Sequence, residues 1–373
     1  MRRPYSGRPL TNGAGSVQNT VGLTVVAAIL LLAGCGSSSA PPTPKARASA
    51  AASTPSAAGS PAPLTGAFAV LATPISADTY TVSIVGVDGK VVASAQASSP
   101  TAVMCGDAAA AVLPLPISTS NDRAYYMDAQ GVVRFLTVQG ESGRATTVPV
   151  GGGRRSMFAV SPDDQRIAVI VSDFTSAGAA IKLYVEDLNG GTNHADIYSQ
   201  ATAFSLWPVG WHGTDNLVVA KVPACTQGGG PFSASPLELH VVDPATAERH
   251  FTLGGPTCVV AGAASPAGVV CEDTSTSLLK QLTWTGGIVK TIPLHNLAPA
   301  YLSPDGSSIA VVGVGVTNIF VGGSKNFDAC GWIDSTHMIG GTSAQPRVWD
   351  FTKPALIPVS AQGICAGRLP GGL

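Results

Sequence analysis

The stretch Ser303-Pro304-Asp305-Gly306-Ser307-Ser308-Ile309-Ala310-Val311-Val312 joins a tight turn directly to a run of apolar, mostly β-branched residues. A proline presets φ for the second position of a turn, and an aspartate at the third position can accept a hydrogen bond from a following backbone N–H. The apolar run has the composition of a buried strand. This stretch therefore predicts a turn that leads straight into a strand.

The same pattern occurs a second time, at Ser161-Pro162-Asp163-Asp164-Gln165-Arg166-Ile167-Ala168-Val169-Ile170. Two related turns carry Gly-Trp instead, at Trp211 and Trp332, and a shorter version begins at Ser265. Where the pattern is complete, an apolar strand begins six residues after the turn's Ser or Trp. A supersecondary unit copied along a chain at a spacing of about forty residues indicates a repeat architecture.

The clearest unit contains four β-rich runs separated by turn residues, and from Gly66 onward no segment keeps a helical period. These runs are Met157–Val160, Ile167–Val171, Ile181–Val185 and Ala195–Tyr198. Four antiparallel strands in each copied unit are typical of a propeller blade. The sequence therefore predicts an all-β protein with a β-propeller fold.

Counting the turns gives seven blades, with six as the alternative because the spacing from Ser303 to Trp332 is tight for four strands. The second unit is expected to begin with a strand within Ala108–Leu115. The first unit has three evident strands, and the segment Gly363–Gly372 looks like an inner strand followed by a degraded turn. We expect this last strand to complete the first blade and close the ring, which leaves no free sheet edge.

The turn pattern resembles that of the TolB-like and WD40-like propeller modules of secreted bacterial lipoproteins. Their repeat carries a Ser-Pro-Asp-Gly turn between the innermost strand and the next one. The resemblance covers Gly66 to Leu373 and is specific at the turns around Ser161 and Ser303. It implies a fold and does not identify a ligand.

The first 34 residues are predicted to be a lipoprotein signal peptide. They hold three arginines and no acidic residue, and Val21–Ala33 forms an apolar run that ends in Leu32-Ala33-Gly34-Cys35. This ending resembles the bacterial lipobox, which implies cleavage before Cys35 and diacylation of its thiol. The alternative is an uncleaved anchor helix, although the run is short for a membrane span. The expected location is the cell membrane, on its extracytoplasmic side, through the lipid on Cys35.

Residues 35–65 are rich in Ser, Ala and Pro and are predicted to be a disordered tether, because such a segment has too little apolar surface to fold. Residues 66–373 are predicted to be the propeller domain. Without residues 1–34 the chain keeps 18 basic and 22 acidic residues, a net charge of −4. This mild acidity argues against nucleic acid as a partner, since nucleic acid requires a basic surface.

Six cysteines remain beyond Cys35, and an even number in an exported chain favours three disulfides. The strand assignment favours Cys258 with Cys271 and Cys330 with Cys365, and it places all six cysteines at one end of the propeller. A bridge between Cys225 and Cys258 competes with the first pair. A zinc site is the other alternative, disfavoured because no Cys-x-x-Cys occurs. The six are Cys105, Cys225, Cys258, Cys271, Cys330 and Cys365.

No nucleophile elbow, Walker loop or His-Glu-x-x-His motif occurs, so no catalytic residue, metal ligand or cofactor is predicted. The best candidates for a ligand-binding face are Trp211 with His212 and Trp332 with His337, although packing tryptophans and turn histidines are the commoner interpretation. The remaining conspicuous residues are interpreted as structural turn residues: Ser161, Pro162, Asp163, Ser303, Pro304, Asp305 and Gly306.

Two loops are further candidates for recognition. Arg154 and Arg155 follow three glycines and could bind an anion, and Gly228-Gly229-Gly230-Pro231 forms a long insertion. The leading hypothesis is a lipid-anchored propeller that serves as a binding or scaffolding module, with a protein or cell-wall ligand at its face. The alternative is a propeller enzyme, such as a lactonase, lyase or glycan hydrolase, whose site is assembled in the channel from several blades. Convergent carboxylates and histidines in the channel would favour the enzyme, and an apolar channel would favour binding.

Overall fold

The computed structural model describes residues 64–106, 109–226, 237–293, 299–311, 327 and 329–373. The predicted signal peptide, the predicted lipidation site Cys35, the tether up to residue 63 and the Gly228–Pro231 insertion lie outside the described residues. Secondary structure in the described part is β throughout. Among these residues no helix is long and apolar enough to cross a membrane.

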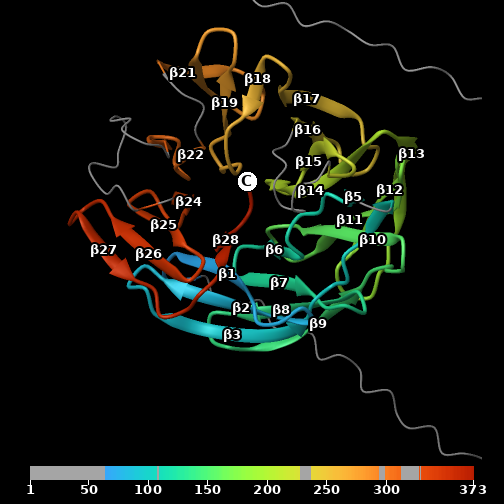
Figure 1. Ribbon diagram of the computed structural model, residues 1–373, viewed down its shortest axis with the longest axis horizontal. Helices are drawn as coiled ribbons and strands as arrows, with labels where there is room; N and C mark the ends of the chain where they lie inside the picture. Colours follow the sequence, from blue (N-terminus) through green and yellow to red (C-terminus); the bar gives the residue numbers. More distant parts are fainter. Residues whose placement is uncertain (1–63, 107–108, 227–236, 294–298, 312–326, 328) are drawn as a thin grey trace, which may run out of the picture. The chain divides into compact units, whose positions relative to one another are not determined.

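The described strands include six four-stranded antiparallel sheets, and in five of them the strands follow one another in chain order. Figure 1 shows these sheets arranged around a central axis, which makes the fold a β-propeller, as predicted. The sheets comprise β28 (Ile364–Leu369), β1 (Phe68–Pro74), β2 (Thr79–Gly86) and β3 (Val91–Ser98); β6 (Ile117–Thr119), β7 (Arg123–Met127), β8 (Val132–Thr137) and β9 (Ser142–Thr147); β10 (Arg154–Val160), β11 (Arg166–Thr175), β12 (Gly178–Asp187) and β13 (Ala195–Thr202); β14 (Phe204–His212), β15 (Asn216–Pro223), β16 (Glu238–Val242) and β17 (Arg249–Gly254); β18 (Cys258–Val260), β19 (Val269–Asp273), β20 (Leu278–Leu282) and β21 (Ile288–Pro293); and β24 (Ala329–Trp332), β25 (His337–Thr342), β26 (Gln345–Asp350) and β27 (Ala355–Pro358).

A two-stranded sheet stands between the fifth and the last of these blades in the chain. It consists of β22 (Ala300–Leu302) and β23 (Ile309–Val311), which flank the Ser303 turn. Seven four-stranded blades were predicted, whereas the described residues contain six complete blades and this pair of strands. The difference falls on the unit whose spacing was noted as tight in the sequence.

The last strand of the chain belongs to the first blade. β28 pairs antiparallel with β1, with Phe68 opposite Leu369 and Ala72 opposite Ile364. The sheet order is therefore β28-β1-β2-β3, with the sequence-distant strand innermost. This is the pairing expected from the three evident strands of the first unit.

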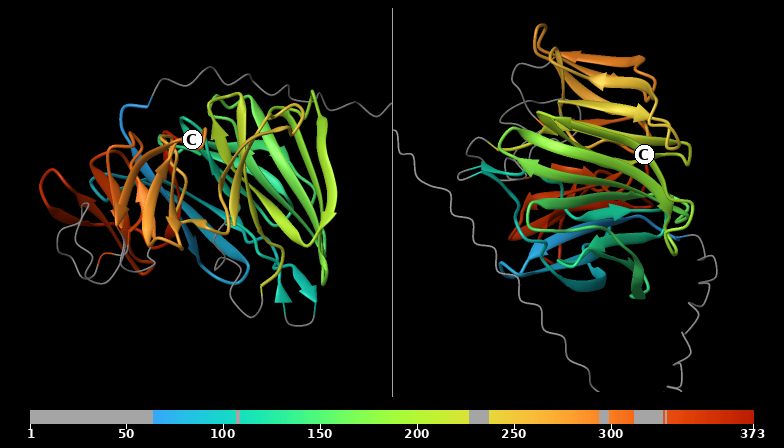
Figure 2. Two further views of the ribbon diagram at one scale, coloured as in Figure 1. Left: turned by 90° about the horizontal axis from the view of Figure 1, so that it is seen from above. Right: turned by 90° about the vertical axis from the view of Figure 1, so that its right-hand side faces the viewer.

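The predicted inner strand of the second blade was wrong. Instead, β4 (Met104–Gly106) and β5 (Ala109–Ala110) pair in a separate two-stranded hairpin, and the inner strand of the blade is β6, further along the chain. After this hairpin, Ala111 forms an isolated antiparallel β-bridge with Cys225 instead of joining an inner strand. The left view of Figure 2 shows this teal hairpin extending from one end of the ring, while residue 373 lies toward the other end.

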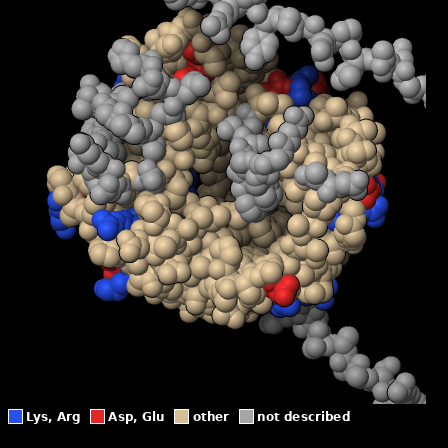
Figure 3. All heavy atoms as spheres, viewed as in Figure 1, with Lys and Arg blue, Asp and Glu red and all other residues tan. Residues whose placement is uncertain are grey.

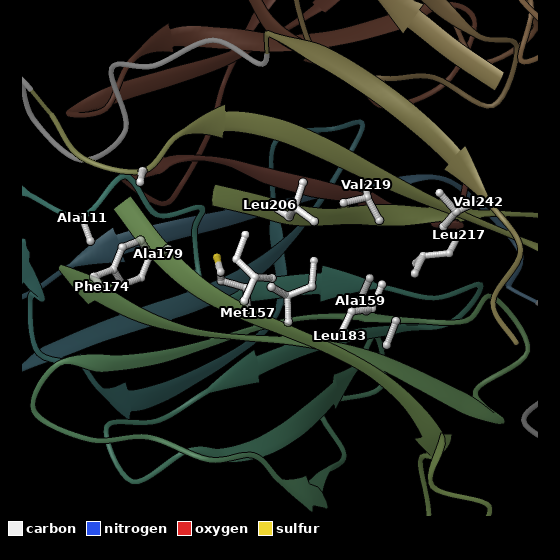
Figure 4. Close-up of a cluster of buried hydrophobic side chains, with 14 of the residues drawn as sticks. Ala111, Met157, Ala159, Phe174, Ala179, Leu183, Leu206, Leu217, Val219 and Val242 are labelled. Atoms are coloured by element: carbon white, nitrogen blue, oxygen red, sulfur yellow. The ribbon is translucent and has the colours of Figure 1, made fainter. Parts of the chain in front are cut away.

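On the face shown in Figure 3, most charged side chains lie toward the rim, and the centre is hollowed. The core lies between neighbouring blades, because alternate residues of each strand face opposite sides of the sheet. Figure 4 shows the cluster between the blades of β10 and β14, where Met157 and Leu183 pack near Leu206 and Leu217. Burying a side chain of this size contributes about 1.5–3 kcal/mol to stability.

Three disulfides link the six cysteines of the propeller domain. Cys258–Cys271 and Cys330–Cys365 are the two predicted pairs, and the third bridge is Cys105–Cys225. The competing Cys225–Cys258 bridge is therefore excluded. Cys330–Cys365 joins the inner strands β24 and β28, and Cys105–Cys225 ties the β4–β5 hairpin to the segment after β15. The bridges thus fasten the end of the ring where inner strands begin.

Candidate functional site

The inner strands surround a central cavity of about 490 Å³. Its walls come from segments that are far apart in sequence: β6, β14, the segment after β18, β22, β24 and β28. Most of the lining is apolar or glycine. The lining residues that matter below are Leu115, Ser118, Trp207, Ser265, Tyr301, Gly331, Trp332 and Arg368.

Among the described residues, Arg368 is the only one with a charged side chain that lines this cavity. It stands on β28 and is half-buried, and desolvation lowers the pKa of its guanidinium below the usual value. No carboxylate among the described residues forms an ion pair with it. A cation that is partly removed from water without an anionic partner is costly, because the surroundings do not replace its hydration. Arg368 is therefore the chemically distinctive group of the cavity.

Two tryptophan rings of the wall are fixed in place by hydrogen bonds. Trp332 Nε1 donates to the main-chain oxygen of Tyr301 over 2.9 Å, and Trp207 Nε1 donates to that of Val112 over 3.1 Å. The Trp332 ring also stacks on Phe351, with 5.2 Å between centroids. With their N–H groups satisfied, these rings offer apolar surface to the cavity.

The segment after β28 forms the remaining part of the wall. Gly371 N donates to Ser120 O over 2.6 Å, and Leu373 N donates to Trp211 O over 2.8 Å. His212 Nδ1 lies 2.9 Å from the main-chain oxygen of Leu373, and its ring stacks on Trp284. This segment therefore links β28 to the residue after β6 and to the end of β14, and it contributes to the cavity lining.

The four residues proposed as a ligand-binding face lie in different environments. Trp211 is fully buried, and its Nε1 donates to Ala159 O over 3.0 Å. His212 contacts Leu373 as described, and His337 Nδ1 lies 3.0 Å from the carboxylate of Asp334. Only Trp332 of the four lines the cavity. The Gly-Trp turns are thus not brought together into one surface.

The two Ser-Pro-Asp turns contain the same hydrogen-bond network. Ser161 Oγ donates to Asp163 over 2.6 Å and accepts from Arg166 N over 2.9 Å. Ser303 Oγ does the same with Asp305 and Ser308 N, at the same two distances. The polar groups of these side chains form hydrogen bonds within their own turns, which supports the structural interpretation made from the sequence.

The Asp305 carboxylate illustrates the electrostatics of this turn. Burial alone would raise the pKa of Asp305, but hydrogen bonds from Ser303 and Ser307 outweigh it and lower the pKa to about 2. The turn therefore holds an ionised aspartate at neutral pH. Its effect belongs to folding stability, because the carboxylate accepts bonds from its own turn.

The Ser161 turn differs at the position that Gly306 occupies in the Ser303 turn. Gly306 has φ +73°, and Asp164 stands at the equivalent place with φ +60°. Tyr125 Oη donates to Asp164 over 2.9 Å, and Arg123 Nε lies 3.6 Å from the same carboxylate. Burial, together with the hydrogen bond to Asp122, raises the pKa of Asp164 to about 6. The sequence analysis missed this polar cluster because its members come from two blades.

No group of three or more His, Cys, Asp or Glu side chains in the described part of the chain is arranged to hold a metal ion. The cavity lining that the structure describes includes no His, Asp or Glu side chain. Arg154, from the predicted anion loop, pairs instead with Asp173 at 2.7 Å. The most distinctive candidate site is therefore the apolar cavity with Arg368.

Comparison with known proteins identifies no function for this chain. No protein-family model and no curated protein matches this chain. Among solved structures, Sqt1 of Saccharomyces cerevisiae is 11% identical over 80% of this chain and 86% of its own, with a TM-score of 0.42. A streptogramin B lyase is 12% identical over 70% of this chain and 86% of its own, with a TM-score of 0.38.

A third similar structure is dipeptidyl peptidase 4 of Porphyromonas gingivalis, 9% identical over 78% of this chain, with a TM-score of 0.45. This chain spans half of that peptidase's length. Similarity at these values carries no argument about function. The functional conclusion must therefore rest on the residues of this chain.

Proposed function

We propose that this chain is a lipid-anchored, extracytoplasmic β-propeller that binds a ligand in its central cavity. The observation that carries the proposal is the cavity itself, with fixed aromatic walls and one cationic side chain. Its volume of about 490 Å³ falls within the range of small-molecule sites, which are mostly apolar with a few placed polar groups. The proposed ligands include small molecules that derive from proteins or from the cell wall.

The lining supports binding over catalysis. A lactonase, lyase or glycan hydrolase needs a general acid or base, a nucleophile or a metal beside the reacting atoms. The described lining offers a guanidinium, a few hydroxyl groups and apolar walls. An arginine can orient an anion, but it does not exchange protons near neutral pH.

The location rests on the sequence at Leu32-Ala33-Gly34-Cys35. The Cys35→Ala variant should lose its lipid and appear in the soluble fraction, while the parent sediments with membranes. A Cys35→Ala protein that still sediments with membranes would refute the lipid anchor. Growth with labelled palmitate, followed by recovery of label in the parent alone, gives a second readout.

We also propose that the ring has seven blades. The strands β22 and β23 flank the complete Ser303 turn network, and β22 lies beside β19 of one adjoining blade and the inner strand β24 of the other, so we assign the pair to the remaining blade. Pairing of β28 with β1 then closes the ring. An experimental structure showing six blades would contradict this count.

The cavity can be tested with a neutral apolar dye and one glycine. A Cβ added at Gly331 would meet no atom within 4 Å, and this residue lines the cavity, so Gly331→Phe should fill the site without strain. N-phenyl-1-naphthylamine should bind the parent with a fluorescence increase and bind Gly331→Phe at least tenfold more weakly. Gly152→Phe is the matched control, because Gly152 is equally uncrowded and lies on an exposed loop. Equal binding by both variants would refute a cavity site.

A further inference from the structure

The charged side chains of this propeller are paired in most places where they approach its interior. Arg123 lies within 4 Å of Asp122 and Asp164, Arg134 lies 3.4 Å from Asp128, and Lys280 lies 2.6 Å from Asp273. Arg368 has no such carboxylate among the described residues, although it lines the central cavity. Arg155 is also buried without an ion pair, and its Nε has no hydrogen-bond partner, but it does not line the cavity. Arg368 is therefore the unpaired guanidinium that a ligand in the described cavity could reach.

We propose that the ligand of the cavity carries a single anionic group on an apolar body, and that Arg368 binds the anionic group. This proposal rests on the proposed function, and it adds the chemical class of the ligand. A guanidinium presents a planar fork of N–H donors that fits the oxygens of a carboxylate or phosphate. An anionic group bound at Arg368 would provide the ion-pair partner that the described residues do not supply.

The walls indicate the rest of the ligand. Leu115, Trp207, Val209 and Trp332 present apolar surface, and the indole N–H groups of both tryptophans are already bonded to main-chain oxygens. An apolar chain or ring system would therefore gain contact area without leaving a polar group unpaired. A compact polar anion would leave most of this surface without a partner.

Two serine hydroxyl groups of the lining are already bonded within the protein. Ser265 Oγ donates to Ser303 O over 2.8 Å, and Ser118 Oγ accepts from Val160 N over 3.0 Å. Both residues therefore already serve the contact between neighbouring blades. An organic cation is disfavoured as well, because it would approach the Arg368 charge in a partly desolvated site.

Two dyes with one skeleton separate this inference from the proposed function. N-phenyl-1-naphthylamine is neutral, and 1-anilinonaphthalene-8-sulfonate carries a sulfonate on the same pair of ring systems. The parent should bind the sulfonate dye at least tenfold more tightly than the neutral dye. The Arg368→Met variant should lose that preference and keep the neutral dye's affinity within about twofold. Arg368→Lys keeps the charge and should retain part of the preference.

Arg144→Met is the matched control, because Arg144 lies on the outer strand β9, where it donates to Thr147. It should bind both dyes as the parent does. If Arg368→Met still binds the sulfonate dye as tightly as the parent, the role of Arg368 is refuted while the cavity stands. If neither dye binds the parent, or if Gly331→Phe binds both unchanged, the proposed function itself fails. Circular dichroism and melting curves establish that each variant is folded.

Displacement of the sulfonate dye distinguishes the natural anionic groups. Decanoate and decyl phosphate offer the two groups on one chain, and decanol is the neutral control. At least one of the two anions should displace the dye at a concentration at least tenfold lower than decanol, and the better one identifies the carboxylate or phosphate class. Equal displacement by decanol would overturn the requirement for an anion.

Discussion

The Ser303 turn and the inner strand β28 both contribute to the interior of the ring, but their polar groups are used in opposite ways. In the turn, Ser303 and Asp305 bond to each other and to backbone N–H groups within five residues. On β28, the Arg368 guanidinium has no carboxylate partner in the described part of the chain. The polar side chains of the repeated turn find their hydrogen-bond partners within the turn, whereas Arg368 on the unrepeated strand finds no carboxylate partner. Under the proposal for Arg368, architecture and ligand binding therefore depend on different residues of the same ring.

The largest expected effect comes from removing the unrepeated strand. Deleting residues 363–373 exposes the edge of β1, removes the buried Leu369 and breaks the Cys330–Cys365 bridge. Loss of a disulfide and a core leucine together costs about 4–10 kcal/mol, so the melting temperature should fall by more than about 10 °C. The double variant Cys330→Ser with Cys365→Ser shows how much of this fall in melting temperature comes from loss of the disulfide. A truncated protein that melts like the parent would contradict the role of β28.

The two Gly-Trp turns should respond differently to truncation of their tryptophans. Trp211→Ala should cost about 3–5 kcal/mol in urea unfolding, because the ring is fully buried and bonded to Ala159. Trp332→Ala should cost a comparable amount, because this residue is also buried, with 6% exposed, but Trp332 lines the cavity, so the substitution should also weaken binding of N-phenyl-1-naphthylamine several-fold. Trp211→Ala should leave dye binding unchanged in the folded fraction. The reverse pattern would show that the cavity is misassigned.

The next prediction uses Asp164, the residue that replaces the turn glycine. Its folded-state pKa of about 6 lies above the value of about 4 in an unfolded chain, so the folded state binds more protons between these limits. Stability of the parent should therefore fall as pH rises from about 4 to 6. Asp164→Asn should be more stable than the parent by about 1–2 kcal/mol at pH 7.5, with no gain at pH 4. Asparagine accepts a positive φ, so the backbone should tolerate it. A gain that is the same at both pH values would contradict this assignment.

The smallest effect is expected at Asp305, where the shift has the opposite sign. Its folded-state pKa of about 2 lies below the unfolded value, so its contribution is present above pH 4 and is lost as pH falls toward 2. Because this carboxylate is exposed, we expect about 1 kcal/mol or less. Asp305→Asn should be slightly less stable than the parent at pH 7 and equal to it near pH 2. A difference that grows toward pH 2 would contradict the sign.

The features that sequence analysis predicted correctly are local. The turns at Ser161 and Ser303 follow from the conformational preferences of Ser, Pro and Asp over four residues, and the strands after them follow from apolar runs. The disulfides Cys258–Cys271 and Cys330–Cys365 followed from the strand assignment, because those cysteines lie on paired or neighbouring strands. Local chemistry was sufficient in each of these cases.

The features that were missed depend on distant contacts. The apolar residues of 108–115 have strand composition, yet Ala111 pairs with Cys225, more than one hundred residues away, and β6 takes the inner position. Arg368 was passed over because its neighbours on the cavity wall come from other blades. One local signal was available, since Arg368 is a charged residue in a predicted inner strand of small residues, Cys365-Ala366-Gly367.

The most direct test of the central claim is a crystal structure of the protein with bound 1-anilinonaphthalene-8-sulfonate. Our account predicts the dye inside the central cavity, with its rings against Trp207 and Trp332 and a sulfonate oxygen about 3 Å from the Arg368 guanidinium. A dye bound outside the cavity, or one whose sulfonate points away from Arg368, would contradict it.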